Sequence, residues 1–221
     1  MTVRFGSLLL ANLGISDVDR DQMIDRARYI FGILHIIVLP PSLLIWLIIH
    51  PGVHWWRRLG PIRTYLIVAS VSLAFGALLF QFRGPLLGAD FGTNWALIVI
   101  APVLYGVVIW LESQYWRHLS ISILVGIPEL SPPEQRKSGL IQDGIYGVIR
   151  HPRYLSAGVA VIAHALLINY AGMYLLIALL VPVGYAMIIF EERELIDRFG
   201  EEYRSYQQAV PRLIPRWRKL R

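Results

Sequence analysis

The sequence has no cysteine among its 221 residues. This absence excludes disulfide bonds, thiolate metal sites, a cysteine nucleophile and lipid attachment through sulfur. Charged residues are also scarce, at 16% of the chain, whereas apolar residues make up 56%. A soluble core of this size does not use so much apolar surface, so the composition indicates an integral membrane protein.

Other signals are missing as well. The sequence shows no internal repeat and no low-complexity region. The apolar stretch at residues 8–11 is too short for the core of a secretory signal, so we expect the first long apolar run to be a retained helix. The net charge is +6, but the basic tail carries a single tryptophan, Trp217, and no repeating aromatic pattern. We therefore expect no nucleic-acid partner.

Five apolar runs have about the length of a membrane-spanning helix. They cover residues 29–49, 61–82, 95–111, 155–169 and 173–190. The sequence thus predicts an all-α integral membrane protein with about five transmembrane helices, the last two forming a hairpin, and a cytoplasmic C-terminal helix. We also expect a short surface helix before the first span, because Ser16 and the aspartates after it suit a helix amino terminus.

Basic residues predict the orientation of these helices. They gather between the first and second runs, between the third and fourth, and after the fifth. Since Lys and Arg resist translocation, this pattern predicts an amino terminus outside and a carboxyl terminus in the cytoplasm. The basic tail is expected to lie on anionic membrane lipids; it contains Arg212, Arg216, Arg218, Lys219 and Arg221.

One stretch has the composition of a linker. Residues 127–139 contain three prolines and several polar residues, which break regular structure and favour contact with water. We therefore divide the chain into an N-terminal part with three helices (1–126), a cytoplasmic linker (127–139) and a C-terminal helical hairpin with its tail (140–221). The last part contains the polar pattern most typical of a site.

A polar loop at residues 144–154 precedes the fourth run, and the carboxylate pair Glu191 and Glu192 follows the fifth. Two helices joined by the short turn at residues 169–172 must return the chain to the side that it left. We therefore expect the loop and the two glutamates to meet at one membrane face, the cytoplasmic one.

The loop has features of an anion site. Pro152 suits the first turn of the fourth helix and pushes His151 towards an extended conformation. This directs Arg150 and His151 towards the amino terminus of the helix, where free N–H groups can hold a carboxylate or phosphate. Gly144 permits a tight turn and a close approach of the backbone to a ligand.

The carboxylates have two interpretations. Adjacent helical residues point about 100° apart, so Glu191 and Glu192 cannot both face one atom; one can meet a ligand cation while the other pairs with an arginine. Alternatively, these charges only form salt bridges at the membrane interface, which are common there. No metal site is expected, because His164 has no partner at ligand spacing.

Beyond these physical patterns, the C-terminal part resembles a known family, the isoprenylcysteine carboxyl methyltransferase and phospholipid methyltransferase superfamily of integral membrane enzymes. The similarity covers about residues 138–215 and keeps order and spacing. It rests on Gly144-x-Tyr146, Arg150-His151-Pro152-x-Tyr154, Glu191-Glu192, Leu195, Phe199-Gly200, Tyr203, Tyr206, Val210-Pro211-Arg212 and Ile214-Pro215.

The resemblance implies a cofactor and a substrate route. S-adenosylmethionine would enter from the cytoplasm, and a lipophilic or small acceptor would reach its methyl group from the bilayer. The glycine-rich turn of soluble methyltransferases is absent, so helix ends would hold the cofactor. Ser156 and Met187 replace a glycine and an arginine that are frequent in the family. The cofactor-binding residues would be Gly144, Tyr146, Arg150, His151, Pro152, Tyr154, Glu191 and Glu192.

The resemblance also implies roles. Arg150 and Glu192 are the predicted catalytic residues: Arg150 would anchor an anionic ligand group, and Glu192 with Glu191 would face the cofactor ammonium or the cationic reaction centre. A carboxylate acceptor needs no strong base, whereas a thiol or amine must lose a proton, for which His151 or a glutamate is available. The alternatives are an NADPH-dependent membrane reductase similar to sterol reductases, or a non-catalytic membrane protein.

Overall fold

The computed structural model describes residues 16–49, 52–116 and 139–216. Within these ranges every regular element is a helix, apart from one isolated bridge between Asp90 and Tyr170. The predicted all-α class is therefore confirmed. The helices are α2 (Asp17–Ile49), α3 (Val53–Leu59), α4 (Pro61–Gln81), α5 (Arg83–Leu87), α6 (Trp95–Tyr115), the 3-10 turn η2 (Gly144–Gly147), α9 (Pro152–Ile168), α10 (Ala171–Phe199) and α11 (Glu201–Ala209).

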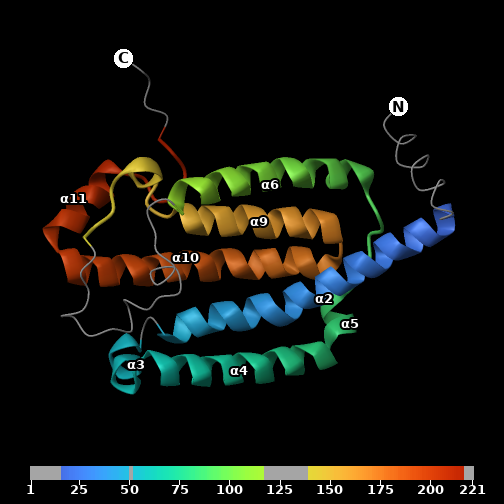
Figure 1. The fold of residues 1–221 in the computed structure, drawn as a ribbon, viewed down its shortest axis with the longest axis horizontal. Coiled ribbons are helices and arrows are strands. Elements are labelled where there is room, and N and C mark those ends of the chain that lie inside the picture. The colour runs from blue at the N-terminus through green and yellow to red at the C-terminus, as the bar shows by residue number, and fades with distance from the viewer. Residues whose placement is uncertain (1–15, 50–51, 117–138, 217–221) are drawn as a thin grey trace, which may run out of the picture.

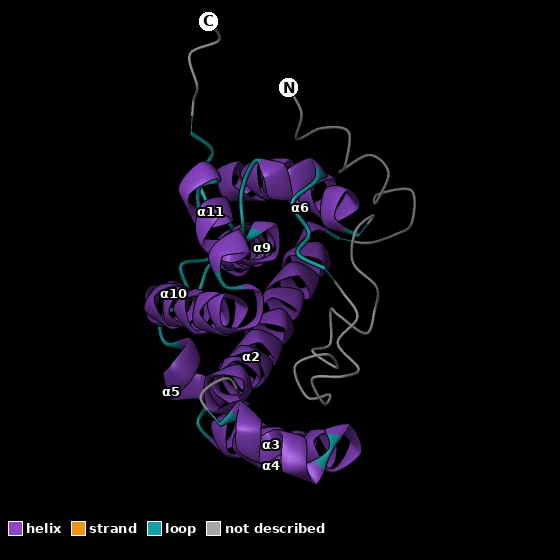
Figure 2. Cartoon of the chain, turned by 90° about the vertical axis from the view of Figure 1, so that its left-hand side faces the viewer, coloured by secondary structure: helices purple, strands orange, loops and turns teal. Residues whose placement is uncertain are grey.

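Five long helices lie side by side in the order α6, α9, α10, α2 and α4 (Figure 1). Helix α2 crosses the others at an angle and also touches α9. Seen from the end, the short helices α3 and α11 lie beside the ends of α4 and α10 (Figure 2). Consecutive helices α9 and α10 thus place residues 152 and 192 at the same end of the bundle.

Four of these helices, α2, α4, α6 and α10, are long and apolar enough to cross a membrane. Much of their surface is apolar and exposed, as expected for contact with lipid. The chain is therefore that of an integral membrane protein. Helix α9 is apolar but has only 17 residues, or about 26 Å at 1.5 Å per residue, against a hydrocarbon core of about 30 Å. The fifth span stays a prediction.

Two helix boundaries differ from the sequence expectation. Ser16 caps a helix, since its hydroxyl accepts from the N–H of Asp19 at 3.1 Å, but this helix is α2 itself. The expected surface helix is thus the first part of α2 and leads into the first span without a break. Likewise, the helix of the fifth apolar run does not end before Glu191 and Glu192, because α10 continues without a break until Gly200, whose φ is +57°.

A buried polar corner connects the helices at the end opposite residue 192. The guanidinium of Arg28 in α2 donates to the backbone carbonyl of Ile168 at 3.0 Å and to the carboxylates of Asp25 and Asp90. Asn169 ends α9 in the left-handed region. These contacts fix the connection between α9 and α10, and an apolar core that includes Ile33, Ile36, Leu87, Ala165 and Met173 packs beside them.

At the other end, two smaller apolar clusters hold the polar loop and α11. Ile145 and Ile149 pack against Leu111 and Tyr115 of α6. The second cluster fixes α11 on α10 and contains Tyr203, Tyr206, Val210, Leu195 and Phe199. Almost all of the predicted linker, residues 127–139, lies outside the described residues.

Candidate active site

The loop before α9 is shaped by backbone bonds to the C-terminal segment. The N–H groups of Arg150 and His151 donate to the carbonyls of Pro211 and Arg212, at 2.9 and 3.1 Å. Pro152 occupies the first turn of α9, as the sequence predicts. The hydroxyl of Tyr206 donates to the carbonyl of Tyr146 at 2.6 Å. Loop, α11 and the segment after α11 therefore form one unit at the end of α9.

Glu192 is the centre of the buried polar contacts in this unit. Its residue is only 3% exposed. Oε1 accepts from Nε and Nη2 of Arg150 at 3.0 and 2.8 Å and lies 3.1 Å from Nε2 of His151. Arg212 reaches both oxygens, with Nη2 2.5 Å from Oε2 and Nε 3.2 Å from Oε1. We call Arg150, His151, Glu192 and Arg212 the Glu192 network.

Arg150 is almost fully engaged within the protein. Nη1 donates to the carbonyls of Gln207 and Val210, while Nε and Nη2 donate to Glu192. A guanidinium has five N–H donors, so this geometry leaves one of them for a ligand. Arg150 therefore joins the loop before α9 to α10 and to the end of α11.

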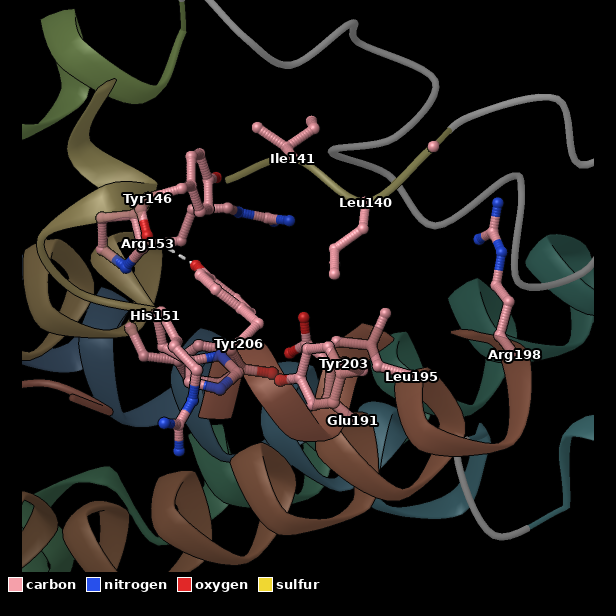
Figure 3. Close-up of a pocket in the computed structure, with 14 residues that line it drawn as sticks. Leu140, Ile141, Tyr146, His151, Arg153, Glu191, Leu195, Arg198, Tyr203 and Tyr206 are labelled. Carbon is pink, nitrogen blue, oxygen red and sulfur yellow. Dashed lines mark hydrogen bonds between the residues drawn. The ribbon is translucent and has the colours of Figure 1, made fainter. Parts of the chain in front are cut away.

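Glu191 differs from its neighbour. It is half-buried and lines the cavity, and it forms no hydrogen bond or ion pair with any residue in the described ranges. The angle of about 100° between successive helical residues explains the difference. Glu192 bonds to the arginines. Glu191 instead presents its carboxylate to the cavity (Figure 3).

The cavity lies between the polar loop, α10 and α11 and has a volume of about 150 Å³. In Figure 3, Tyr146 and Arg153 lie across it from Glu191 and Leu195. Of the eight predicted cofactor-binding residues, Gly144 and Glu192 do not line it. The six that do are Tyr146, Arg150, His151, Pro152, Tyr154 and Glu191.

Three tyrosines beside the cavity remain neutral at physiological pH. Burial raises the pKa of Tyr206 to about 12 and raises the pKa values of Tyr146 and Tyr203 well above their usual range. Their hydroxyls therefore act as hydrogen-bond donors and not as bases. Tyr203 lines the cavity, and its buried hydroxyl has no hydrogen-bond partner among the described residues.

Several residues of this site were not predicted to have a role in it. Arg212 was expected to lie on lipid headgroups, which is wrong, because its guanidinium bonds to Glu192. The cavity is also lined by Leu140, Ile141, Arg198 and Tyr203. The spaced motif Val210-Pro211-Arg212 could have indicated a role for Arg212 in the site. An apolar residue that lines the cavity, such as Leu140, has no distinctive sequence pattern.

Comparisons with known proteins give consistent results. A family model described as phospholipid methyltransferase matches residues 97–202. Methanethiol S-methyltransferase 1 of Bradyrhizobium diazoefficiens is 32% identical over 181 residues, which cover 75% of this chain and 59% of that protein. The methanethiol S-methyltransferase of a Pseudomonas species is 29% identical over 186 residues, or 73% of this chain and 64% of that protein.

A shorter match involves the protein-S-isoprenylcysteine O-methyltransferase of Schizosaccharomyces pombe, 32% identical over 77 residues, which cover 34% of this chain and 33% of that protein. The chain thus spans less than two thirds of the length of each of these relatives. The names of the relatives agree with the resemblance found in the sequence, which is thereby confirmed.

Proposed function

The chain belongs to the superfamily of membrane methyltransferases, and we propose that it transfers a methyl group from S-adenosylmethionine to a small thiol. The observation that supports this most is the half-buried carboxylate of Glu191, which lies in a cavity at the family motif and has no partner among the residues that the structure describes. A carboxylate removed from bulk water and without a protein cation is a suitable partner for a cationic ligand.

The residues present fit this cofactor. Its amino-acid end carries an ammonium group, which Glu191 would bind, and a carboxylate, which a tyrosine hydroxyl can bind. Tyr203 has such a hydroxyl without a partner among the described residues. The cavity of about 150 Å³ is smaller than the roughly 300–1,000 Å³ of typical ligand pockets. It would therefore hold one end of the cofactor, with the nucleoside extending out of it.

When bound, the sulfonium of S-adenosylmethionine supplies an already activated methyl group. The work left to the protein is to bind, align and exclude water. We assign the binding of the positive ligand end to Glu191. The Glu192 network would hold the loop that forms the opposite wall, and Tyr146 and Tyr154 would line the ligand. This differs from the sequence expectation, in which Arg150 and Glu192 themselves are catalytic.

The relatives favour a thiol as the acceptor. Those named methanethiol S-methyltransferase match about three quarters of this chain, whereas the isoprenylcysteine enzyme matches one third. In the proposed reaction the thiol gives its proton to water, its sulfur forms a bond to the methyl carbon, and the bond from that carbon to the sulfonium breaks. S-adenosylhomocysteine and a thioether result. An apolar thiol can reach the site through the bilayer around α9 and α10.

The test is methyl transfer by purified protein in nanodiscs with radiolabelled S-adenosylmethionine. Methanethiol, a farnesylated cysteine and a phosphatidylethanolamine serve as acceptors. We expect a labelled thioether from methanethiol. Label in the prenylated cysteine or the phospholipid alone would contradict the thiol assignment, and no transfer to any acceptor would contradict the enzyme assignment.

A matched pair of variants tests the role of Glu191. Glu191→Gln keeps the shape but removes the charge, and we expect it to weaken binding of S-adenosylhomocysteine by about tenfold to a hundredfold, the range for a lost charged hydrogen bond. Asp197→Asn makes the same change at an exposed position of the same helix and should bind normally. Equal affinities for both variants and the wild type would remove Glu191 from the site.

We further propose that the site faces the cytoplasm, because basic residues gather at this end of the bundle. The absence of cysteine makes single introduced cysteines clean reporters. Ile214 lies at the site end and Phe91 at the opposite end, and both are exposed. In intact cells, an impermeant maleimide should label Phe91→Cys and spare Ile214→Cys. The reverse pattern would place the site outside.

A further inference from the structure

The C-terminal segment after α11 contacts Glu192 and the polar loop on the side away from the cavity. Arg212 does not line the cavity, yet its guanidinium donates to both carboxylate oxygens of Glu192. Its third nitrogen, Nη1, lies 2.5 Å from the hydroxyl of Tyr185, and the guanidinium packs over that ring at 5.2 Å. Both partners belong to α10, so Arg212 is fixed to that helix at two positions.

The same segment is bonded to the polar loop through the backbone. The carbonyls of Pro211 and Arg212 accept from the N–H groups of Arg150 and His151, and the carbonyl of Val210 accepts from the side chain of Arg150. Arg150 and His151 both line the cavity. The segment therefore lies between α10 and the loop, and its position sets the distance between the two walls.

From these contacts we infer that Arg212 is a positioning residue of the site: it acts through Glu192 to hold Arg150 and His151 in place opposite Glu191. The inference rests on the proposed function for its effect on cofactor binding. Without Arg212, Oε2 of Glu192 loses the donor that it has in the structure, and a buried carboxylate without full pairing moves or attracts water. The loop on the other side of Glu192 then loses its fixed position.

The contact also explains how two adjacent glutamates have different tasks. Both arginines of the network bind Glu192, so its charge is balanced within the protein, and Glu191 remains available for a ligand. Loss of Arg212 leaves Oε2 of Glu192 without its donor, so that Glu192 can shift and compete for the same ligand cation. This change lowers affinity for the cofactor without a direct contact between Arg212 and the ligand.

The experiment compares Arg212→Ala with Arg216→Ala, which removes the same charge four residues later at an exposed position. Two readouts are taken on full-length protein in detergent. Hydrogen exchange measures the exchange rates of the loop amides at residues 150–151, and calorimetry measures the affinity for S-adenosylhomocysteine. We expect faster exchange and about tenfold weaker binding in Arg212→Ala, the effect of one charged hydrogen bond, and no change in Arg216→Ala.

Arg212→Lys keeps one charged donor and should recover part of the affinity. If Arg212→Ala fails to fold, the test uses Arg212→Lys alone. Exchange rates and an affinity in Arg212→Lys that equal those of the wild type would then overturn the inference. A lower melting temperature with unchanged affinity in Arg212→Ala would also overturn it, since that is a purely structural role. Failure of the wild type to bind S-adenosylhomocysteine would instead reject the proposed function, while the exchange comparison would still test the contact between Arg212 and the loop.

Discussion

Replacement of Glu192 by alanine is expected to destabilise the protein strongly. The side chain is buried and accepts hydrogen bonds from two arginines and contacts His151. Removing one partner of a buried ion pair costs about 3–5 kcal/mol, because the other charge stays buried without compensation. Most of this cost arises from the guanidinium of Arg150, because its side chain is only 8% exposed and stays buried without the carboxylate. The side chain of Arg212 is 32% exposed and can turn to water.

The adjacent residue supplies the control. Glu191 is half-buried and forms no hydrogen bond or ion pair within the described part of the chain, so Glu191→Ala should change stability by no more than about 0.5 kcal/mol. For a chain of this size, 1 kcal/mol shifts the melting temperature by about 2–4 °C. We therefore expect a decrease of about 6–20 °C for Glu192→Ala and little change for Glu191→Ala.

Thermal unfolding of both variants is followed by circular dichroism in the same detergent and at the same heating rate. Equal melting temperatures for the two variants would contradict a structural role that belongs to Glu192 and not to Glu191. A larger decrease for Glu191→Ala would refute it as well.

Two further predictions concern the opposite end of the bundle. Gly172→Ala should lower the melting temperature, because a Cβ there would lie 1.9 Å from the carbonyl oxygen of Leu86, whereas Gly184→Ala in the same helix meets nothing within 4 Å and should be neutral or stabilising. The pKa of Asp90 is lowered: burial acts to raise it, but the Gly92 N–H and the Arg28 guanidinium outweigh burial. The ionised Asp90 carboxylate therefore makes its full contribution to the free energy of unfolding above its ordinary pKa of 3.8. This contribution is lost as the pH falls through the lowered pKa. Asp90→Asn should reduce the difference between neutral and acid melting temperatures, and an unchanged difference would contradict the assignment.

The sequence was sufficient to predict that the loop at residues 144–154 lies close to Glu191 and Glu192, because this proximity depends only on how the helices are connected. Apolar runs joined by a short turn return the chain to the same end, and the structure brings Arg150 to within 2.8 Å of Glu192. The periodicity of a helix also separates Glu191 from Glu192. These arguments need only the chain order and the angle of about 100° per residue.

Other features depend on tertiary contacts that no local pattern encodes. The charge of Arg212 fits lipid headgroups as well as it fits a carboxylate, and only the backbone bonds between residues 211–212 and 150–151 decide between them. Similarly, α2 begins at Asp17 because nothing interrupts the helix between its cap and the first span.

The direct test of the central claim is the binding of S-adenosylhomocysteine and of NADPH to the detergent-purified protein, measured by calorimetry. We predict that S-adenosylhomocysteine binds, that Glu191→Gln weakens this binding while Asp197→Asn does not, and that NADPH does not bind. Binding of NADPH alone would identify a reductase, and binding of neither ligand would mean that the cavity at Glu191 is not a cofactor site.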